Sequence, residues 1–147
     1  MKKRILKNVS VFLLILVLCF LLFSLPIQAG ASGGPIKSKY YNSVASISGV
    51  SSSGYLTITN SYYVTGAGFS SAEIHTYVER RVLGIFWSKV DNGQTDNTWI
   101  DTSSKLNFEK NHYLSLPQSG TYRVTAEFTF YGSNGSESIT KQQTVTY

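Results

Sequence analysis

The sequence predicts an all-β protein, a single antiparallel sandwich of two sheets with about seven strands. Three observations support this prediction. Apolar and polar residues alternate along several short runs, as in strands that bury one face. Clusters of Gly, Ser and Asn separate these runs at short spacing, and no stretch after residue 31 shows helical periodicity. Short strands with one apolar face each stack those faces together, and two packed sheets achieve this.

A leader precedes the predicted domain. Four basic residues near the start are followed by an unbroken apolar run, Val11 to Phe23, as in a secretory signal peptide. Ala29-Gly-Ala31 places small residues where a signal peptidase reads the chain. We therefore predict a helical signal peptide over residues 1–31, cleavage between Ala31 and Ser32, and a secreted protein without stable membrane insertion after cleavage. A cut after Ala29 and an uncleaved anchor are the alternatives, because residues 9–25 approach the roughly 17 residues that span a bilayer.

Charge and cysteine content exclude several functions. The chain has 147 residues, with 13 Lys and Arg, 8 Asp and Glu, and one Cys. The leader holds four of the basic residues and Cys19, so the 116 residues after it (147 less 31) carry nine basic and eight acidic side chains. This near balance excludes a strongly basic nucleic-acid binder. The lack of Cys after the leader excludes disulfides, Cys-based zinc sites and a Cys nucleophile there.

The first half of the domain contains three predicted strands. Residues 32–41, rich in Gly and polar side chains, are expected to be a flexible lead-in, and the domain occupies residues 42–147. Its first strand is predicted over residues 42–50. The second has a strict two-residue period, with apolar members at Leu56, Ile58, Tyr62 and Val64. A loop over 66–71 precedes the third, which places Ile74, Thr76 and Val78 on one face and His75, Tyr77, Glu79 and Arg81 on the other.

The middle of the domain is harder to interpret. A turn over residues 82–85 leads into a fourth predicted strand over 86–91. The segment 94–104 is polar apart from Trp99 and Ile100, and no element is predicted there.

The last part of the domain shows clear alternation again. Leu106 and Phe108 indicate a short fifth strand, and two long strands follow at about 122–131 and 137–147. Asn134-Gly135 lies between them and favours a type I′ hairpin turn, because both residues tolerate positive φ.

Tyr122 refines the fold class. In immunoglobulin-like sandwiches, a Tyr near the start of the sixth strand hydrogen-bonds to upstream backbone, forming the tyrosine corner. Tyr122 stands at such a position, and Val124 occupies the place two residues on where antibody domains carry Cys. The predicted sandwich is therefore immunoglobulin-like, with an ordinary buried Tyr122 as the alternative.

Over residues 42–147 the chain resembles small secreted proteins of Gram-positive bacteria that are catalogued as a domain of unknown function. The likeness rests on the leader, on Tyr77-Val-Glu-Arg80, on a hairpin that closes on Gly84 and Trp87, and on Tyr122-Arg-Val-Thr-Ala126. Ile85-Phe86 between Gly84 and Trp87 departs from the family pattern. The resemblance implies secretion and a small β-sandwich, and it implies no activity.

No set of residues predicts catalysis, a cofactor or a metal site. The two histidines, His75 and His112, have no spacing typical of metal ligands, and His75 is expected on a solvated face. The chain after the leader contains neither a Gly-x-Ser-x-Gly elbow nor a Gly-rich phosphate-binding loop. Asp91, Asp96, Asp101 and Glu109 cluster in the chain as a glycosidase pair would require, but loop charges that keep strand edges apart are the expected role.

Aromatic residues are the remaining signal. All ten Tyr and both Trp lie after the leader, and several fall at outward positions of predicted strands. Exposed aromatics bind sugar rings or protein partners, whereas cross-strand aromatic pairs also stabilise a sheet on their own. The candidate contact surface consists of His75, Tyr77, Glu79, Arg81 and Trp87.

The predicted function is that of a secreted, non-enzymatic binding module at the cell envelope or outside the cell. Its partner would be a protein or a cell-envelope glycan, and neither the oligomeric state nor the ligand follows from the sequence. A small secreted toxin or antimicrobial factor is the alternative, and a hydrolase of wall polymers is a third.

Overall fold

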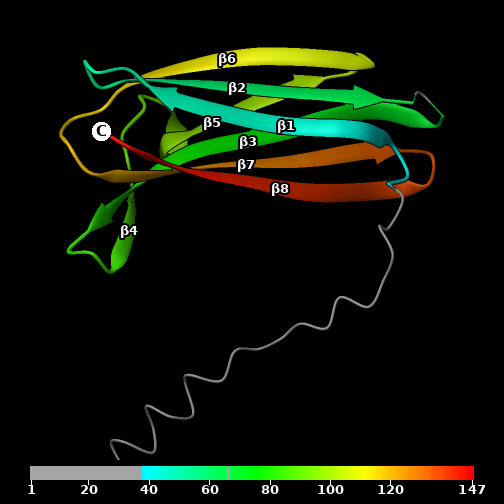
Figure 1. Cartoon of the computed structure of the whole chain (residues 1–147). Coiled ribbons are helices and arrows are strands. Elements are labelled where there is room, and N and C mark those ends of the chain that lie inside the picture. The colour runs from blue at the N-terminus through cyan, green and yellow to red at the C-terminus, as the bar shows by residue number, and fades with distance from the viewer. Residues whose placement is uncertain (1–37, 66) are drawn as a thin grey trace, which may run out of the picture. The chain divides into compact units, whose positions relative to one another are not determined.

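The computed structural model describes residues 38–65 and 67–147. The predicted signal peptide, its cleavage site at Ala31 and Ser32, and most of the lead-in lie outside these ranges. The described chain forms two antiparallel sheets, which confirms the all-β sandwich (Figure 1).

The two sheets contain eight strands. The first has the order β1-β2-β6, with β1 at Tyr41–Val50, β2 at Tyr55–Val64 and β6 at Asn107–Ser115. The second has the order β4-β3-β7-β8, with β4 at Phe86–Lys89, β3 at Phe69–Val82, β7 at Thr121–Gly132 and β8 at Gly135–Thr146. β5, at Thr98–Ser103, follows the short 3-10 helix η1 at Thr95–Asn97 and pairs with β3. β1-β2-β6 opposite β3-β7-β8 corresponds to strands A-B-E opposite C-F-G of the immunoglobulin sandwich.

The predicted phasing of the long strands is confirmed. Leu56 and Ile58 in β2, Ile74 and Val78 in β3, and Val124 in β7 are all buried between the sheets. The core consists of two apolar clusters, one at each end of the sandwich. The first contains Tyr40, Tyr62, Val64, Ala72, Ile74, Ala126, Phe128 and Phe130. The second contains Leu56, Ile58, Val78, Val90, Leu114, Leu116, Tyr122 and Val124.

Polar contacts also connect the two sheets. The Asn60 Nδ2 in β2 donates to Thr76 Oγ1 in β3 at 2.7 Å, and within the first sheet Ser46 Oγ donates to Asn60 Oδ1 at 2.8 Å. Asn60 and Thr76 are fully buried, so these bonds satisfy groups that would otherwise be costly in the core. At the edge, the Gln143 side chain of β8 exchanges hydrogen bonds with the Ser48 backbone of β1.

Tyr122 forms the predicted tyrosine corner. Its ring is fully buried, and its hydroxyl donates to the backbone carbonyl of Gln118, four residues upstream.

The packed domain begins before Asn42. Tyr40 is 1% exposed, and its hydroxyl donates to the carbonyl of Gly135 at 3.0 Å and accepts from the N–H of Asn134 at 3.0 Å. Tyr40 therefore holds the turn between β7 and β8.

That turn differs from the prediction. Gly132 pairs with Gly135, so Ser133 and Asn134 are the central residues, and neither has a positive φ. Gly135 takes the positive φ of 95° at the position after them. The hairpin is confirmed, whereas the type I′ assignment is wrong. The Tyr40 hydroxyl that holds the turn lies 94 residues away in the sequence, beyond the reach of a local pattern.

Three boundaries also differ from the prediction. β3 starts at Phe69, inside the expected loop, because Phe69 packs against the first apolar cluster. β6 is one strand of nine residues rather than a short one. The segment around Trp99 contains a strand, β5, that the polar composition concealed.

Candidate binding surface

The structure brings the five predicted contact residues together on the outward face of the β3 sheet. His75, Tyr77 and Glu79 alternate along β3 with the buried residues Ile74, Thr76 and Val78, and Arg81 continues the same face beyond them. Trp87 of β4 pairs with Arg81 in the strand register. The hairpin of β3 and β4 therefore places the Trp ring beside the charged row, as the sequence predicts.

Glu79 and Trp87 meet through Arg123 on the neighbouring strand β7. The Arg123 Nε and Nη2 donate to Glu79 Oε2 at 2.8 and 2.6 Å. The guanidinium carbon of Arg123 lies 4.4 Å from the centroid of the Trp87 ring. The guanidinium thus satisfies a carboxylate and contacts an aromatic face, and both contacts are favourable for Arg. These contacts hold β4 against the body of the sheet.

Tyr77 lies in a second group of contacts. Its hydroxyl donates to Glu127 Oε1 at 3.3 Å, and the Lys89 Nζ lies 4.7 Å from the centroid of its ring. Lys89 also donates to the carbonyl of Asp96 and to Thr98 Oγ1. Burial raises the pKa of the Tyr77 phenol above its ordinary value of 10.0, and the Glu127 carboxylate raises it further. The phenol is therefore a neutral hydrogen-bond donor at physiological pH.

His75 completes the row. Its Nε2 lies 2.6 Å from Glu73 Oε1, and both side chains are 38% exposed. Most side chains of this face already have partners within the sheet. Most of these side chains are therefore already held in position before any partner binds.

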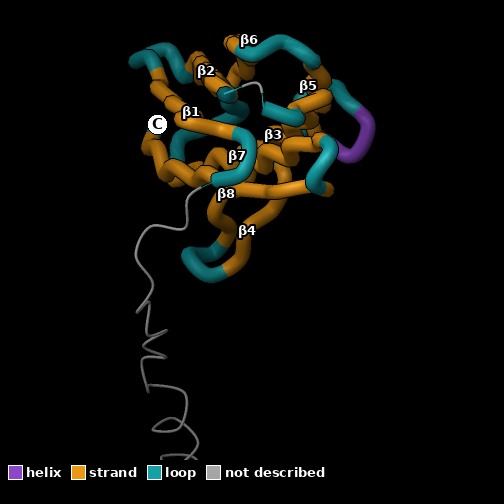
Figure 2. The backbone as a smooth tube through the Cα atoms, turned by 90° about the vertical axis from the view of Figure 1, so that its right-hand side faces the viewer, coloured by secondary structure: helices purple, strands orange, loops and turns teal. Residues whose placement is uncertain are grey.

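The hairpin tip beyond this face has no such partners. Leu83 is 84% exposed, Ile85 72%, Phe86 63% and Val82 36%. The hairpin projects away from both sheets (Figures 1 and 2). Soluble proteins rarely present contiguous apolar residues in this way unless the surface has a binding role.

The tip also contains backbone strain. Leu83 and Gly84 have φ values of 51° and 71°, and the N–H of Ile85 donates to the carbonyl of Val82 at 3.1 Å. The strand register pairs Val82 with Phe86, so the loop has three residues, and its first turn has both central residues at positive φ, as in a type I′ turn, which favours Asn or Gly. A Leu in the left-handed region costs about 1–2 kcal/mol. Because the Leu83 side chain is 84% exposed, it gains little packing energy that would offset this cost.

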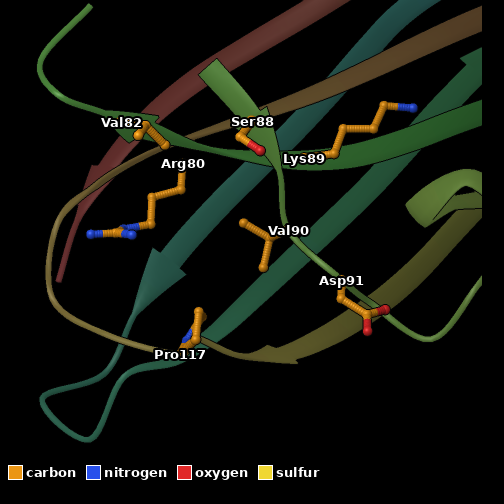
Figure 3. Close-up of a pocket in the computed structure, with 7 residues that line it drawn as sticks. All are labelled: Arg80, Val82, Ser88, Lys89, Val90, Asp91 and Pro117. Carbon is orange, nitrogen blue, oxygen red and sulfur yellow. The ribbon is translucent and has the colours of Figure 1, made fainter. Parts of the chain in front are cut away.

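A small open pocket lies at the base of the hairpin (Figure 3). Its volume is about 230 Å³, below the range typical of sites that enclose small molecules. Arg80, Ser88 and Asp91 line it together with Pro117 of the β6–β7 loop. The Arg80 guanidinium donates to the side-chain oxygen of Gln118, in the amide orientation that satisfies both groups. Arg80 is thereby fixed to the loop beside the hairpin.

The structure corrects the expectation for Asp101. It lies in β5 rather than in a loop, its side chain is 14% exposed, and its Oδ2 is 2.6 Å from the Nε2 of His112 in β6. His112 also stacks on Trp99, with ring centroids 4.8 Å apart. The group connects an edge strand of one sheet to an edge strand of the other. Across residues 38–65 and 67–147, no three His, Cys, Asp or Glu side chains form a group that could hold a metal ion.

Sequence reasoning identified Trp87 but missed the hairpin tip. The available signal was composition: five of the six residues from Val82 to Trp87 are apolar, and Gly84 is the other. Turns at the surface ordinarily carry polar residues, so an exposed turn made of apolar residues is unusual unless it has a function.

Comparisons with known protein families, with curated proteins and with solved structures find no match to this chain. In the part of the chain that the structure describes, no helix is long and apolar enough to span a membrane.

Proposed function

We propose that the protein is an exported, non-enzymatic binding module that acts at the cell envelope or outside the cell. The observation that carries the proposal is the projecting β3–β4 hairpin, with Leu83, Ile85 and Phe86 exposed at its tip. The leader supports export, and the internally partnered face below the hairpin supports binding by a rigid surface rather than by an adaptable loop.

The contact surface combines two parts. The first is the hairpin tip, and the second is the row of His75, Tyr77, Glu79, Arg81 and Trp87 beneath it. The tip offers apolar area without partners. Four members of the row, all except Arg81, are already held in position by contacts within the sheet, which lowers the entropy lost on binding.

Cosedimentation tests this proposal. The protein without its leader, residues 32–147, is mixed with isolated cell wall, with membranes and with whole cells of Gram-positive bacteria. We expect saturable binding to at least one fraction, and we expect the double variant Ile85→Ser/Phe86→Ser to lose it. Ile47→Ser is the matched control, because Ile47 is 65% exposed on β1, in the other sheet.

A second double variant separates the two parts of the surface. Tyr77→Ala/Trp87→Ala removes the aromatic groups of the row and leaves the tip sequence unchanged. Binding that survives this change but not the tip variant would assign the contact to the tip alone. Equal binding by all variants, with circular dichroism showing intact folding, would contradict the proposed surface.

A further inference from the structure

The arrangement of side chains around the hairpin identifies the class of surface that it meets. Neighbouring residues of a strand point to opposite faces. Because Val82, Leu83, Ile85 and Phe86 are all exposed, the tip is apolar on both faces of the hairpin. A protein groove or a flat sheet contacts one face of a hairpin, whereas a lipid layer surrounds it.

From tip to base, the side chains of the hairpin change from apolar to aromatic to cationic, which is the order found from the interior of a lipid layer to its surface. The apolar tip comes first, Trp87 and Arg81 follow as a cross-strand pair, and Arg80 and Lys89 lie at the base. Residues 80–90 contain no acidic side chain. Trp is enriched at the boundary between lipid tails and headgroups, and Arg and Lys attract anionic headgroups.

Arg81 is the cation best placed for such a contact. It is exposed, and it forms no ion pair or hydrogen bond with another side chain in the described part of the domain. Lys89 and Arg80, in contrast, are held by Tyr77 and Gln118.

The depth of the tip fits a lipid interface. The tip extends two residue pairs beyond Trp87 and Arg81, which is about 7 Å at roughly 3.3 Å per residue. Interfacial segments bury their apolar face by about 5–10 Å. The turn's own hydrogen bond, from Ile85 to Val82, satisfies backbone groups that the lipid would leave unpaired.

We propose that the β3–β4 hairpin inserts reversibly into the headgroup region of membranes rich in anionic phospholipid, with Trp87 at the interface and Arg81 at the phosphates. This inference rests on the proposed binding function and names its ligand. The attachment is peripheral, because the tip is far too short to cross a bilayer.

Vesicle binding tests the inference. The protein without its leader is cosedimented with vesicles of phosphatidylcholine alone and with vesicles of equal parts phosphatidylcholine and phosphatidylglycerol. We expect binding to the anionic vesicles that weakens with added salt. Burial of one large apolar side chain changes an equilibrium by roughly tenfold or more, so Ile85→Ser/Phe86→Ser should weaken binding on the order of 100-fold. Arg81→Gln should weaken it about fivefold, and Ile47→Ser should leave it unchanged.

Fluorescence of Trp87 measures insertion directly. Trp99→Phe leaves Trp87 as the sole Trp of the chain. We expect its emission to shift to shorter wavelength on anionic vesicles and to be quenched by lipids brominated on the acyl chains. Binding without quenching would overturn insertion.

The remaining outcomes separate this inference from the proposed function. Equal binding to neutral and anionic vesicles would overturn the role of the cations. Binding to lipid-free wall but to neither vesicle, lost in the tip variant, would overturn the lipid inference and leave the proposed function intact. No binding to vesicles, wall or cells would overturn both.

Discussion

At the scale of single residues, Leu83 departs furthest from the preference of its backbone. Leu83→Asn should raise the free energy of unfolding by about 1 kcal/mol, because Asn tolerates the left-handed region better than Leu. Leu83→Ala is the matched control, since it shortens an exposed side chain and keeps the Cβ that causes the strain. Urea denaturation measures both. Equal stability of the two variants would contradict a strained turn.

Gly132 is required for a different reason. A Cβ at this position would lie against the carbonyl of Gly68 and 2.6 Å from the Tyr40 ring. Gly132→Ala should therefore lower the free energy of unfolding by about 1–3 kcal/mol through overpacking. Gly49→Ala is the control, because a methyl group there would meet no atom within 4 Å. A similar loss in both variants, measured by thermal denaturation, would rule out the close approach as the cause.

The two histidines allow a comparison between buried and exposed pairs. Each lies 2.6 Å from a carboxylate, but His112 and Asp101 are nearly buried whereas His75 and Glu73 are not. His112→Ala should cost about 1–3 kcal/mol, because Asp101 loses its partner away from water. His75→Ala should cost less than about 1 kcal/mol, because a polar contact between partly exposed side chains contributes little. Chemical denaturation of both variants tests the difference, and equal losses would contradict the buried connection.

At the scale of elements, the phasing of β7 is the clearest test of the sandwich. Val124 is 1% exposed between the sheets. Val124→Asp should prevent folding, because it places an unpaired charge in the core. Thr129→Asp in the same strand points outward and should leave a folded domain, and circular dichroism distinguishes the two. A folded Val124→Asp protein would overturn the packing described for β7.

Elements with strong local alternation were predictable, and elements specified by distant contacts were not. β2, β3 and β7 carry a two-residue period that dictates which face is buried. β5 is short, and its Trp99 stacks on His112 of another strand, a contact that the local sequence does not reveal. The β7–β8 turn depends on the Tyr40 hydroxyl.

Part of the candidate surface was likewise predictable from local sequence and part was not. The row on β3 follows from strand period alone, so His75, Tyr77, Glu79 and Arg81 could be placed on one face from the sequence. Trp87 could be added because a tight hairpin returns it beside β3. The exposed tip could not be foreseen, because apolar composition does not by itself distinguish a buried turn from a projecting one.

At the scale of the whole molecule, stability should fall at alkaline pH. Burial raises the pKa of Tyr41, Tyr62 and Tyr77 above 10.0 in the folded protein. Unfolded tyrosines lose their protons from about pH 10 upward, while these three still hold theirs, so the unfolded state binds fewer protons. The contribution of these three tyrosines to the free energy of unfolding is fully present below pH 10.0, and it is lost as the pH rises through their raised pKa values in the folded protein.

A pH series of urea denaturation curves measures this loss. Tyr62→Phe and Tyr77→Phe should each make the alkaline decline less steep, because Phe cannot ionise. An unchanged decline in both variants would show that other groups cause it.

The place where the chain enters the domain also has a mechanical consequence. Tyr40 lies beside Gly135, at the end of the sandwich where β3 begins, whereas the hairpin tip follows Val82 at the other end of β3. The 14 residues of β3 separate the two by about 40 Å at roughly 3.3 Å per residue. A partner bound at the tip would therefore not contact the point where the chain enters the domain.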